Sequence, residues 1–322
     1  AVHPRSHHRK MSVDARRRLN RPVELAAASG RPYNRDMVAP SSVLRPTDAQ
    51  ALADWAALID ADAAQVARVR EPEPAADHYA AMAARFRPGQ LPSLELPVLE
   101  TFTQPTDTWL DIGAGGGRFA VPLARRVARV IAVEPSASMR DTLASAAADA
   151  GVSNIEIHDL RWPVASWSES GDVSLAAHSL YDIREIAPFL DAMERYTRRL
   201  CIAVFGQAAR GASLAPLFEA VHGEPLQTLP ALREFVALLG ARGRRYEVHT
   251  VGTGSTVELT PPDEAYEMAR RMLWLTPDSA KDGQMRTLMQ ERWGQADGIA
   301  MPAARPFIGI VSWEPPGSRS AP

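Results

Sequence analysis

The sequence is poor in the side chains that several chemistries require. It has one cysteine, Cys201, so an intramolecular disulfide is excluded and a thiolate metal site cannot be built. Only Lys10 and Lys281 of its 36 basic residues are lysines, which limits any lysine-dependent mechanism to two positions. No apolar run approaches the roughly 18 residues of a membrane span. The sequence therefore predicts a cytoplasmic protein with no metal and no membrane partner.

The composition is otherwise that of an ordinary globular protein. The 322 residues are 46% hydrophobic and 23% charged, enough for one large domain with additions or two modest domains. The formal net charge of -2 gives no general attraction to nucleic acid, so we expect no DNA partner. Nothing in the sequence indicates the oligomeric state.

The basic charge is concentrated at the N-terminus. Residues 1–35 carry nine Arg and Lys against Asp14 and Glu24, a net of +7, with little apolar periodicity. This predicts a disordered basic arm over residues 1–46. The arm lacks the apolar segment and cleavage site of a secretory signal, whereas a transit peptide or a phosphate-binding tail stays open. We expect Met37 to be the natural start and residues 1–36 to be extraneous.

Two helices are predicted before the main fold. Thr47 can cap a helix that carries Ala51, Trp55 and Ile59 on one face. After the proline-rich break at 71–74, a second helix is expected through Tyr79 and Phe86. We interpret residues 47–95 as an N-terminal helical lid.

Short apolar runs then alternate with amphipathic segments. Five predicted strands, separated by helices, begin at Thr108, Val130, Ile155, Val173 and Leu200. This order is typical of a doubly wound α/β fold with a mostly parallel sheet, here over residues 96–208. Residues 209–322 add a helix over Leu229–Leu239, strands over Tyr246–Val251 and Phe307–Trp313, and a helical insertion at about 261–298.

A glycine loop follows the first strand, in the run Leu110-Asp111-Ile112-Gly113-Ala114-Gly115-Gly116-Gly117-Arg118. Glycines let a backbone turn tightly and approach a ligand where a Cβ would clash. The dinucleotide pattern G-x-G-x-x-G, begun at Gly113, needs glycine where this chain has Arg118. If the pattern starts at Gly115 instead, its last position is Ala120, and the pattern is then out of register with the end of the strand. Asp111 would repel a pyrophosphate but suits a cofactor with a cationic amine, such as S-adenosylmethionine.

Two more acids follow the next strands. Glu134, 17 residues beyond Gly117, is placed to accept hydrogen bonds from both ribose hydroxyls, which fits NAD and S-adenosylmethionine equally. Asp159 can accept from an adenine amino group while Leu160 covers the ring, although the same spacing suits a helix cap.

The run from Trp109 to Gly206 resembles the core of a class I S-adenosylmethionine-dependent methyltransferase. The resemblance rests on the glycine loop, Val133-Glu134-Pro135-Ser136, His158-Asp159-Leu160 and Ala177-His178-Ser179-Leu180-Tyr181-Asp182. It implies a Rossmann-like sheet with an antiparallel last strand and S-adenosylmethionine as cofactor. The predicted cofactor-binding residues are Asp111, Gly113, Ala114, Gly115, Gly117, Glu134, Pro135, Met139, Asp159, Leu160 and His178, with Tyr79 and Phe86 as a cover.

The resemblance places the end of the fourth strand beside the transferred methyl group. His178 is the first candidate for a general base, because imidazole titrates near neutral pH. It can equally shape the cofactor pocket by packing. We expect Tyr181 to orient substrate, and Asp182 is a further catalytic candidate that can also cap the next helix. Tyr266, Met272 and Trp274 are candidates for an apolar acceptor pocket.

Three absences narrow the acceptor. Asn/Asp-Pro-Pro-Tyr, which holds a flipped base, does not occur at the fourth strand. Cys201, the one possible thiol nucleophile for methylation of cytosine C5, lies inside a predicted strand. The predicted core has no lysine for a lysine-based ribose 2′-O mechanism. These absences favour a small-molecule acceptor. The alternatives are a protein or RNA methyltransferase, a non-catalytic protein that binds S-adenosylmethionine and, disfavoured by Arg118 and Asp111, an NAD-dependent oxidoreductase.

Overall fold

The structure, a computed structural model, describes residues 45–209, 211–253, 258–302 and 306–317. The chain divides into two compact units, residues 1–41 and 42–322, and all described residues belong to the second. Residues 1–44 of the predicted basic arm therefore lie outside the described residues.

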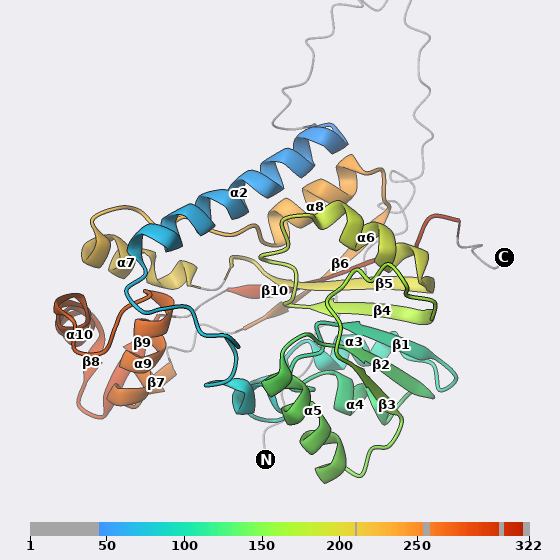
Figure 1. Cartoon of the computed structure of the whole chain (residues 1–322), viewed down its shortest axis with the longest axis horizontal. Coiled ribbons are helices and arrows are strands. Elements are labelled where there is room, and N and C mark those ends of the chain that lie inside the picture. The colour runs from blue at the N-terminus through green and yellow to red at the C-terminus, as the bar shows by residue number, and fades with distance from the viewer. Residues whose placement is uncertain (1–44, 210, 254–257, 303–305, 318–322) are drawn as a thin grey trace, which may run out of the picture. The chain divides into compact units, whose positions relative to one another are not determined.

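A seven-stranded sheet in the order β3-β2-β1-β4-β5-β10-β6 forms the centre of the described fold (Figure 1). The first five are parallel, and β10 is antiparallel to both β5 and β6. The strands are β1 (Thr108–Ile112), β2 (Arg129–Val133), β3 (Ile155–His158), β4 (Gly171–Ala177), β5 (Thr197–Gly206), β6 (Tyr246–Gly252) and β10 (Phe307–Trp313). The expected mostly parallel sheet with an antiparallel last strand is confirmed.

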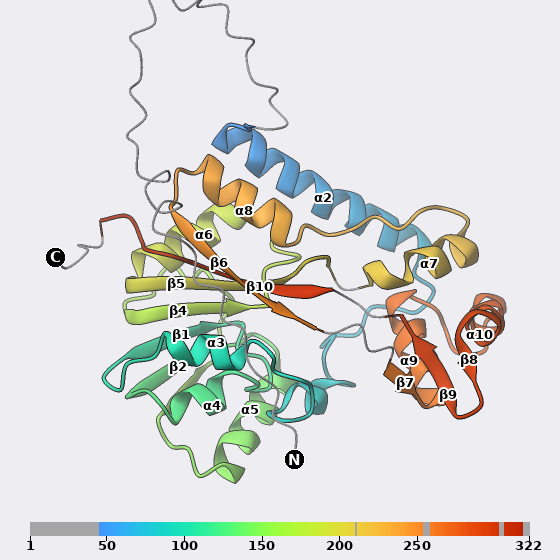
Figure 2. The ribbon, with the colours of Figure 1, turned by 180° about the vertical axis from the view of Figure 1, so that it is seen from behind.

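Helices cover both faces of this sheet, as Figure 2 shows from behind. One face carries α3 (Leu96–Thr101), α4 (Ala120–Ala124) and α5 (Ala137–Asp149), and the other carries α2 (Asp48–Val69), α6 (Ile186–Arg195) and α8 (Leu232–Ala241). The central strands are buried on both sides, which is why their sequences are continuous apolar runs rather than alternating ones.

The first helix of the predicted lid belongs to the core. A capping box between Thr47 and Gln50 begins α2. From its inner face, Trp55 packs edge-on against Phe205 at 6.3 Å and donates its indole N–H to the Ile183 carbonyl at 2.9 Å. This helix is therefore part of a sheet-covering layer.

The second helix expected in the lid is not formed. Residues 76–82 are turns and bends, and only the four-residue 3₁₀ helix η1 (Ala83–Phe86) follows. Asp77 explains the local shape, because its carboxylate accepts from the Tyr79 N–H at 3.0 Å and the Ser138 N–H at 3.1 Å. These bonds tie the segment to the beginning of α5.

The predicted helical insertion is a mixed α/β unit. Its elements are α9 (Pro262–Met272), α10 (Ala280–Trp293), β7 (Glu258–Thr260), β8 (Gly294–Gln295) and β9 (Gly298–Met301). The three strands form a second sheet in the order β7-β9-β8, which the sequence did not predict. With α7 (Ala215–His222), which follows η2 (Ala212–Leu214), the unit encloses its own apolar cluster.

Among the described residues, no helix is both long enough and apolar enough to cross a bilayer.

We expect Trp55→Ala to lower the free energy of unfolding by about 3–5 kcal/mol, because it empties a fully buried aromatic site. Urea denaturation measures the change. Asp54→Ala, at the exposed neighbouring position, is the control and should stay within about 0.5 kcal/mol of the parent. A loss below about 1 kcal/mol for Trp55→Ala would show that α2 is peripheral to the fold.

Candidate active site

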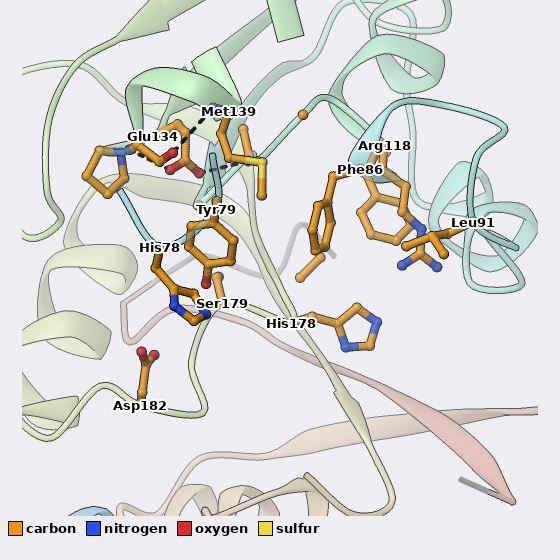
Figure 3. Close-up of a pocket in the computed structure, with 18 of the residues that line it drawn as sticks. His78, Tyr79, Phe86, Leu91, Arg118, Glu134, Met139, His178, Ser179 and Asp182 are labelled. Atoms are coloured by element: carbon orange, nitrogen blue, oxygen red, sulfur yellow. Dashed lines mark hydrogen bonds between the residues drawn. The ribbon is translucent and has the colours of Figure 1, made fainter. Parts of the chain in front are cut away.

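The candidate site is a cavity of about 1270 Å³ at the carboxyl ends of the parallel strands (Figure 3). The loops after β1, β2 and β3 line one part of it, and the segment after β4 continues the wall. Residues 75–95 and α9 also contribute, and Arg85 and Glu264 form an exposed ion pair of 3.4 Å between these two segments.

The glycine loop comes very close to the segment after β4. Gly113 has φ +78°, and a Cβ there would lie 2.5 Å from the Ser179 Cβ, so no larger residue fits. Gly117 has φ +87°, and a Cβ would lie 2.5 Å from a Leu143 methyl group. Gly113 therefore lets the loop pack closely on the segment after β4, and Gly117 lets it pack on α5.

Glu134 follows β2 and is held by backbone amides. Its two carboxylate oxygens accept from the Gly115 N–H and the Ser136 N–H, each at 2.8 Å. Burial raises the pKa of this carboxyl, although the two amides oppose the increase. The remaining lone pairs are available to hydroxyl donors, as recognition of a ribose requires.

Asp111 ends β1 as a buried acid. It is 3% exposed, and no hydrogen bond or ion pair to its carboxylate occurs within the described part of the chain. Burial, and then the charge of Glu134, raise its pKa to about 7. A cationic ligand would stabilise the ionised form of this buried carboxyl group, which burial disfavours.

A second buried acid, Glu95, joins three segments. It is fully buried and accepts from Arg118 at 2.9 Å and from His178 Nε2 at 2.7 Å. Burial would raise the pKa of the Glu95 carboxyl, but the hydrogen bond from His178 and the charge of Arg118 outweigh it and hold the pKa below its usual value. The carboxylate is therefore ionised at neutral pH.

His178 is held on both ring nitrogens. Nδ1 lies 3.2 Å from the Tyr181 hydroxyl, which accepts the Gly206 N–H at 2.6 Å. With Nε2 donating to Glu95, Nδ1 is the acceptor from Tyr181. His178 also has a left-handed backbone, with φ +58°. Both ring nitrogens are thus engaged by side chains of the protein, so the geometry favours a positioning role for His178 over a general base.

The cavity brings most of the predicted site residues together. Figure 3 shows Tyr79 and Phe86 projecting between the Glu134 side and the His178 side. The predicted residues that line the cavity are Tyr79, Phe86, Asp111, Gly113, Ala114, Gly115, Glu134, Pro135, Met139, Leu160, His178 and Asp182. Of the apolar acceptor candidates, Met272 lines it, whereas Tyr266 and Trp274 do not.

Three of the predicted cofactor-binding and catalytic residues do not line the cavity. Gly117 packs on α5, and Tyr181 is buried beneath His178. The Asp159 side chain is 70% exposed and pairs with Arg140 at 2.7 Å. The structure thus places Asp159 on the surface beside the site, where Leu160 rather than Asp159 faces the cavity.

Several lining residues were missed from the sequence. Asp77 and Glu95 have no motif that marks them, and Ser179 stands in the motif after β4 without a predicted role, because the partners of all three are distant in the chain. In the sequence, Arg118 is notable only as the residue that breaks the dinucleotide pattern. In the structure its guanidinium pairs with Glu95. Asp77 is strongly acidic: the Ser138 N–H, then the Ser138 hydroxyl, lower its pKa to about 2.

One cluster among the described residues has metal-ligand chemistry. Potential ligand atoms of Glu156, His158 and Glu169 lie within 4.8 Å of one another. Arg129 pairs with Glu156 and, at 2.7 Å, with Glu169. One guanidinium thus already pairs with both carboxylates of this cluster, which is separate from the cavity lining.

The central part of the chain is similar to known methyltransferases. Residues 110–205 match a family model described as a methyltransferase domain. The 23S rRNA (uracil(1939)-C(5))-methyltransferase RlmD from two strains of Pseudomonas aeruginosa is 34% identical over 99 residues. That match covers 27% of this chain, and the chain spans only 22% of the length of these curated relatives.

Residues 110–205 form a class I methyltransferase domain. Its cofactor is S-adenosylmethionine.

Two solved structures are also similar. YcgJ from Bacillus subtilis has a TM-score of 0.49 and 16% identity, over 70% of this chain and 99% of that one. YjhP from E. coli has a TM-score of 0.47 and 15% identity, over 74% of this chain and 99% of that one.

The methyltransferase domain fits its cofactor at two places. Asp111 is an unpaired buried acid, which matches the cationic amino group of S-adenosylmethionine. Glu134 accepts from two backbone amides and keeps lone pairs for hydroxyl donors, which matches the ribose.

We expect Asp111→Asn to stabilise the cofactor-free domain at pH 8. The Asp111 pKa rises from 3.8 in the unfolded chain to about 7 in the fold, so its contribution to stability is lost as pH rises between these values. The variant should exceed the parent by an amount on the order of 2–4 kcal/mol at pH 8 and by almost nothing at pH 4. Denaturant unfolding at both pH values measures this difference. A destabilised variant at pH 8 would contradict the assignment.

Glu95→Gln should lower the free energy of unfolding by about 1–3 kcal/mol at pH 7, because Arg118 and His178 lose their shared charge partner. The folded-state pKa of Glu95 is lowered, so its contribution is present above its ordinary pKa of 4.5 and is lost as pH falls through the lower value. Urea titrations at neutral and acidic pH test this. Equal losses at both would show that the variant acts through packing alone.

Proposed function

We propose that the protein transfers the methyl group of S-adenosylmethionine to a small-molecule acceptor. The observation that carries this proposal is the single cavity, in which the residues suited to the cofactor and a further wall from α9 and β9 line one space. A covered cavity admits a small molecule, and exclusion of water from it favours the transfer.

The reaction is a displacement at carbon. S-adenosylmethionine supplies a methyl group already activated by the sulfonium. The acceptor's lone pair forms the new bond to the methyl carbon, the carbon–sulfur bond breaks, and its electron pair remains on sulfur. Any proton carried by the attacking atom passes to water or a basic side chain. The chain's own task is mainly alignment and exclusion of water.

Each part of the cavity has a proposed role. Glu134 binds the ribose, Asp111 the amino group, and Met139 and Leu160 flank the adenine. Tyr79 and Phe86, whose ring centroids are 6.1 Å apart, cover the cofactor. Glu95 fixes His178 at the methyl end, and Asp182, an exposed residue that also lines the cavity, is the remaining candidate base.

We also propose that the chain after its N-terminal arm divides into residues 47–95, 96–208 and 209–322.

The charge of the cavity supports a small acceptor over RNA. Its lining includes five carboxylates, of Asp77, Glu95, Asp111, Glu134 and Asp182, but only two guanidiniums, of Arg118 and Arg161. Arg118 is already paired with Glu95. RNA binding relies on basic contacts to phosphate, which this lining opposes.

RNA methylation is the second candidate, because the similarity to RlmD falls on an rRNA methyltransferase. Methylation of a pyrimidine C5 through a covalent thiolate would require Cys201. Burial in β5 raises the pKa of this thiol to about 12, so it stays protonated.

The absence of a DNA partner and the cytoplasmic location also remain predictions.

Glu134→Ala should abolish both cofactor binding and methyl transfer, since it removes the ribose acceptor and the support of the Gly115 N–H. Calorimetric titration of S-adenosylhomocysteine measures binding. Glu219→Ala, at an exposed position on α7, is the matched control and should bind as the parent does.

The acceptor class is tested with S-adenosylmethionine labelled in its methyl group. The protein is incubated with separated low-molecular-weight, RNA and protein fractions of a cell extract. Label in the low-molecular-weight fraction supports the proposal. Label in RNA alone would establish the second candidate, and tight cofactor binding without transfer to any fraction would favour a non-catalytic binding protein.

A further inference from the structure

We infer that the acceptor carries an uncharged, apolar body, which binds against a methionine-lined wall formed by α9 and β9. This inference rests on the proposed methyl transfer and names its substrate class. It is carried by the division of the cavity into two chemically different parts.

Sheet order creates this division. The residues suited to the cofactor follow β1, β2 and β3, on one side of β4. On the other side of β4, the wall continues through Ile308 of β10 and Thr253, which follows β6. His178 and Ser179, directly after β4, lie between the two parts. The acceptor would therefore occupy the part beyond β4, toward β10 and β6.

The acceptor part has apolar chemistry. The lining residues from α9, β9, β10 and the segments beside them include six apolar residues, namely Leu214, Met268, Met272, Met301, Pro302 and Ile308. These segments also contribute three hydroxyl-bearing residues, Ser213, Thr253 and Thr260. None of these described lining residues carries a charge, whereas the cofactor part holds Asp111 and Glu134. An anionic group bound against these nine residues would lose its hydration without gaining a cation from them.

The methionines are presented by a unit with its own core. Met268 and Met272 are one turn apart on α9, while Ala265 and Ala269 of the same helix are fully buried against the apolar cluster. Met301 ends β9, which pairs with β7. The helix therefore has a fixed inner face and a partly exposed methionine face. Methionine side chains are unbranched and polarisable, so this wall can adapt to a flat or irregular apolar ligand.

The volume of the cavity is above the range for one ligand. Pockets that hold one drug-sized ligand have volumes of about 300–1,000 Å³. The cavity here is about 1270 Å³, which is consistent with an acceptor bound beside the cofactor.

Two fluorescent probes with the same aromatic skeleton test this inference. N-phenyl-1-naphthylamine is uncharged, and 8-anilino-1-naphthalenesulfonate adds one sulfonate. In the presence of S-adenosylhomocysteine, we expect the uncharged probe to bind saturably, with one molecule per chain, and the anionic probe to bind about tenfold more weakly.

The variant Met268→Gln/Met272→Gln should weaken binding of the uncharged probe about fivefold, because it replaces the apolar wall. Met272→Leu should retain binding. Val248→Gln is the matched control, since Val248 is 40% exposed on β6 but does not line the cavity. Unchanged affinity for S-adenosylhomocysteine shows that each variant is folded.

Equal or tighter binding of the anionic probe would overturn the inference. Binding of the uncharged probe that is insensitive to the double substitution would overturn it as well. Failure of the parent protein to bind S-adenosylhomocysteine would instead refute the proposed function, whatever the probes show.

Discussion

The site depends on the contact between the glycine loop and the segment that follows β4. The Ser179 hydroxyl donates to the Ile112 carbonyl at 2.9 Å, and its Cβ occupies the space that a side chain on Gly113 would need. Successive parallel strands are added outward from β1 to β3, and the chain then returns to place β4 on the other side of β1. Loops diverge at this reversal, and a crevice opens there in sheets of this kind.

Unequal charge on the two sides of that crevice gives the cavity its chemistry. On one side, Asp111 and Glu134 are held within a buried wall, and each has a raised pKa because burial disfavours the carboxylate. On the other side, the described lining holds methionines, other apolar residues and hydroxyl groups. The same cavity therefore suits a cation at one end and an uncharged molecule at the other.

Glu95 shows how a distant segment completes such a site. It comes from the turn before α3 and reaches both Arg118 at the end of the glycine loop and His178 after β4. The pair of buried contacts orients His178, whose left-handed backbone would otherwise be unfavourable. Since Glu95 lies 83 residues from His178 in the chain, no local pattern marks it as part of the site.

Local patterns were sufficient for much of the fold. The strands of the large sheet are short apolar runs between helical segments, and burial on both faces makes such runs readable. The glycine loop, Glu134 and His178 follow strand ends, so the topology alone brings them to one edge of the sheet. Patterns failed where tertiary contacts decide local structure, as in residues 76–86, which Asp77 ties to α5, and in β8 and β9, whose runs are too short to recognise.

The sequence by itself determined the α/β class and the loop chemistry, and it favoured S-adenosylmethionine over a dinucleotide, because these depend on residue type and spacing along the chain. Only the tertiary structure decided which side chains face the cavity. It moved Asp159 to the surface, engaged both ring nitrogens of His178 and brought Glu95 and the methionines of α9 to the site. These outcomes depend on packing between residues far apart in sequence, and on the free energy of burying charge, neither of which a local pattern encodes.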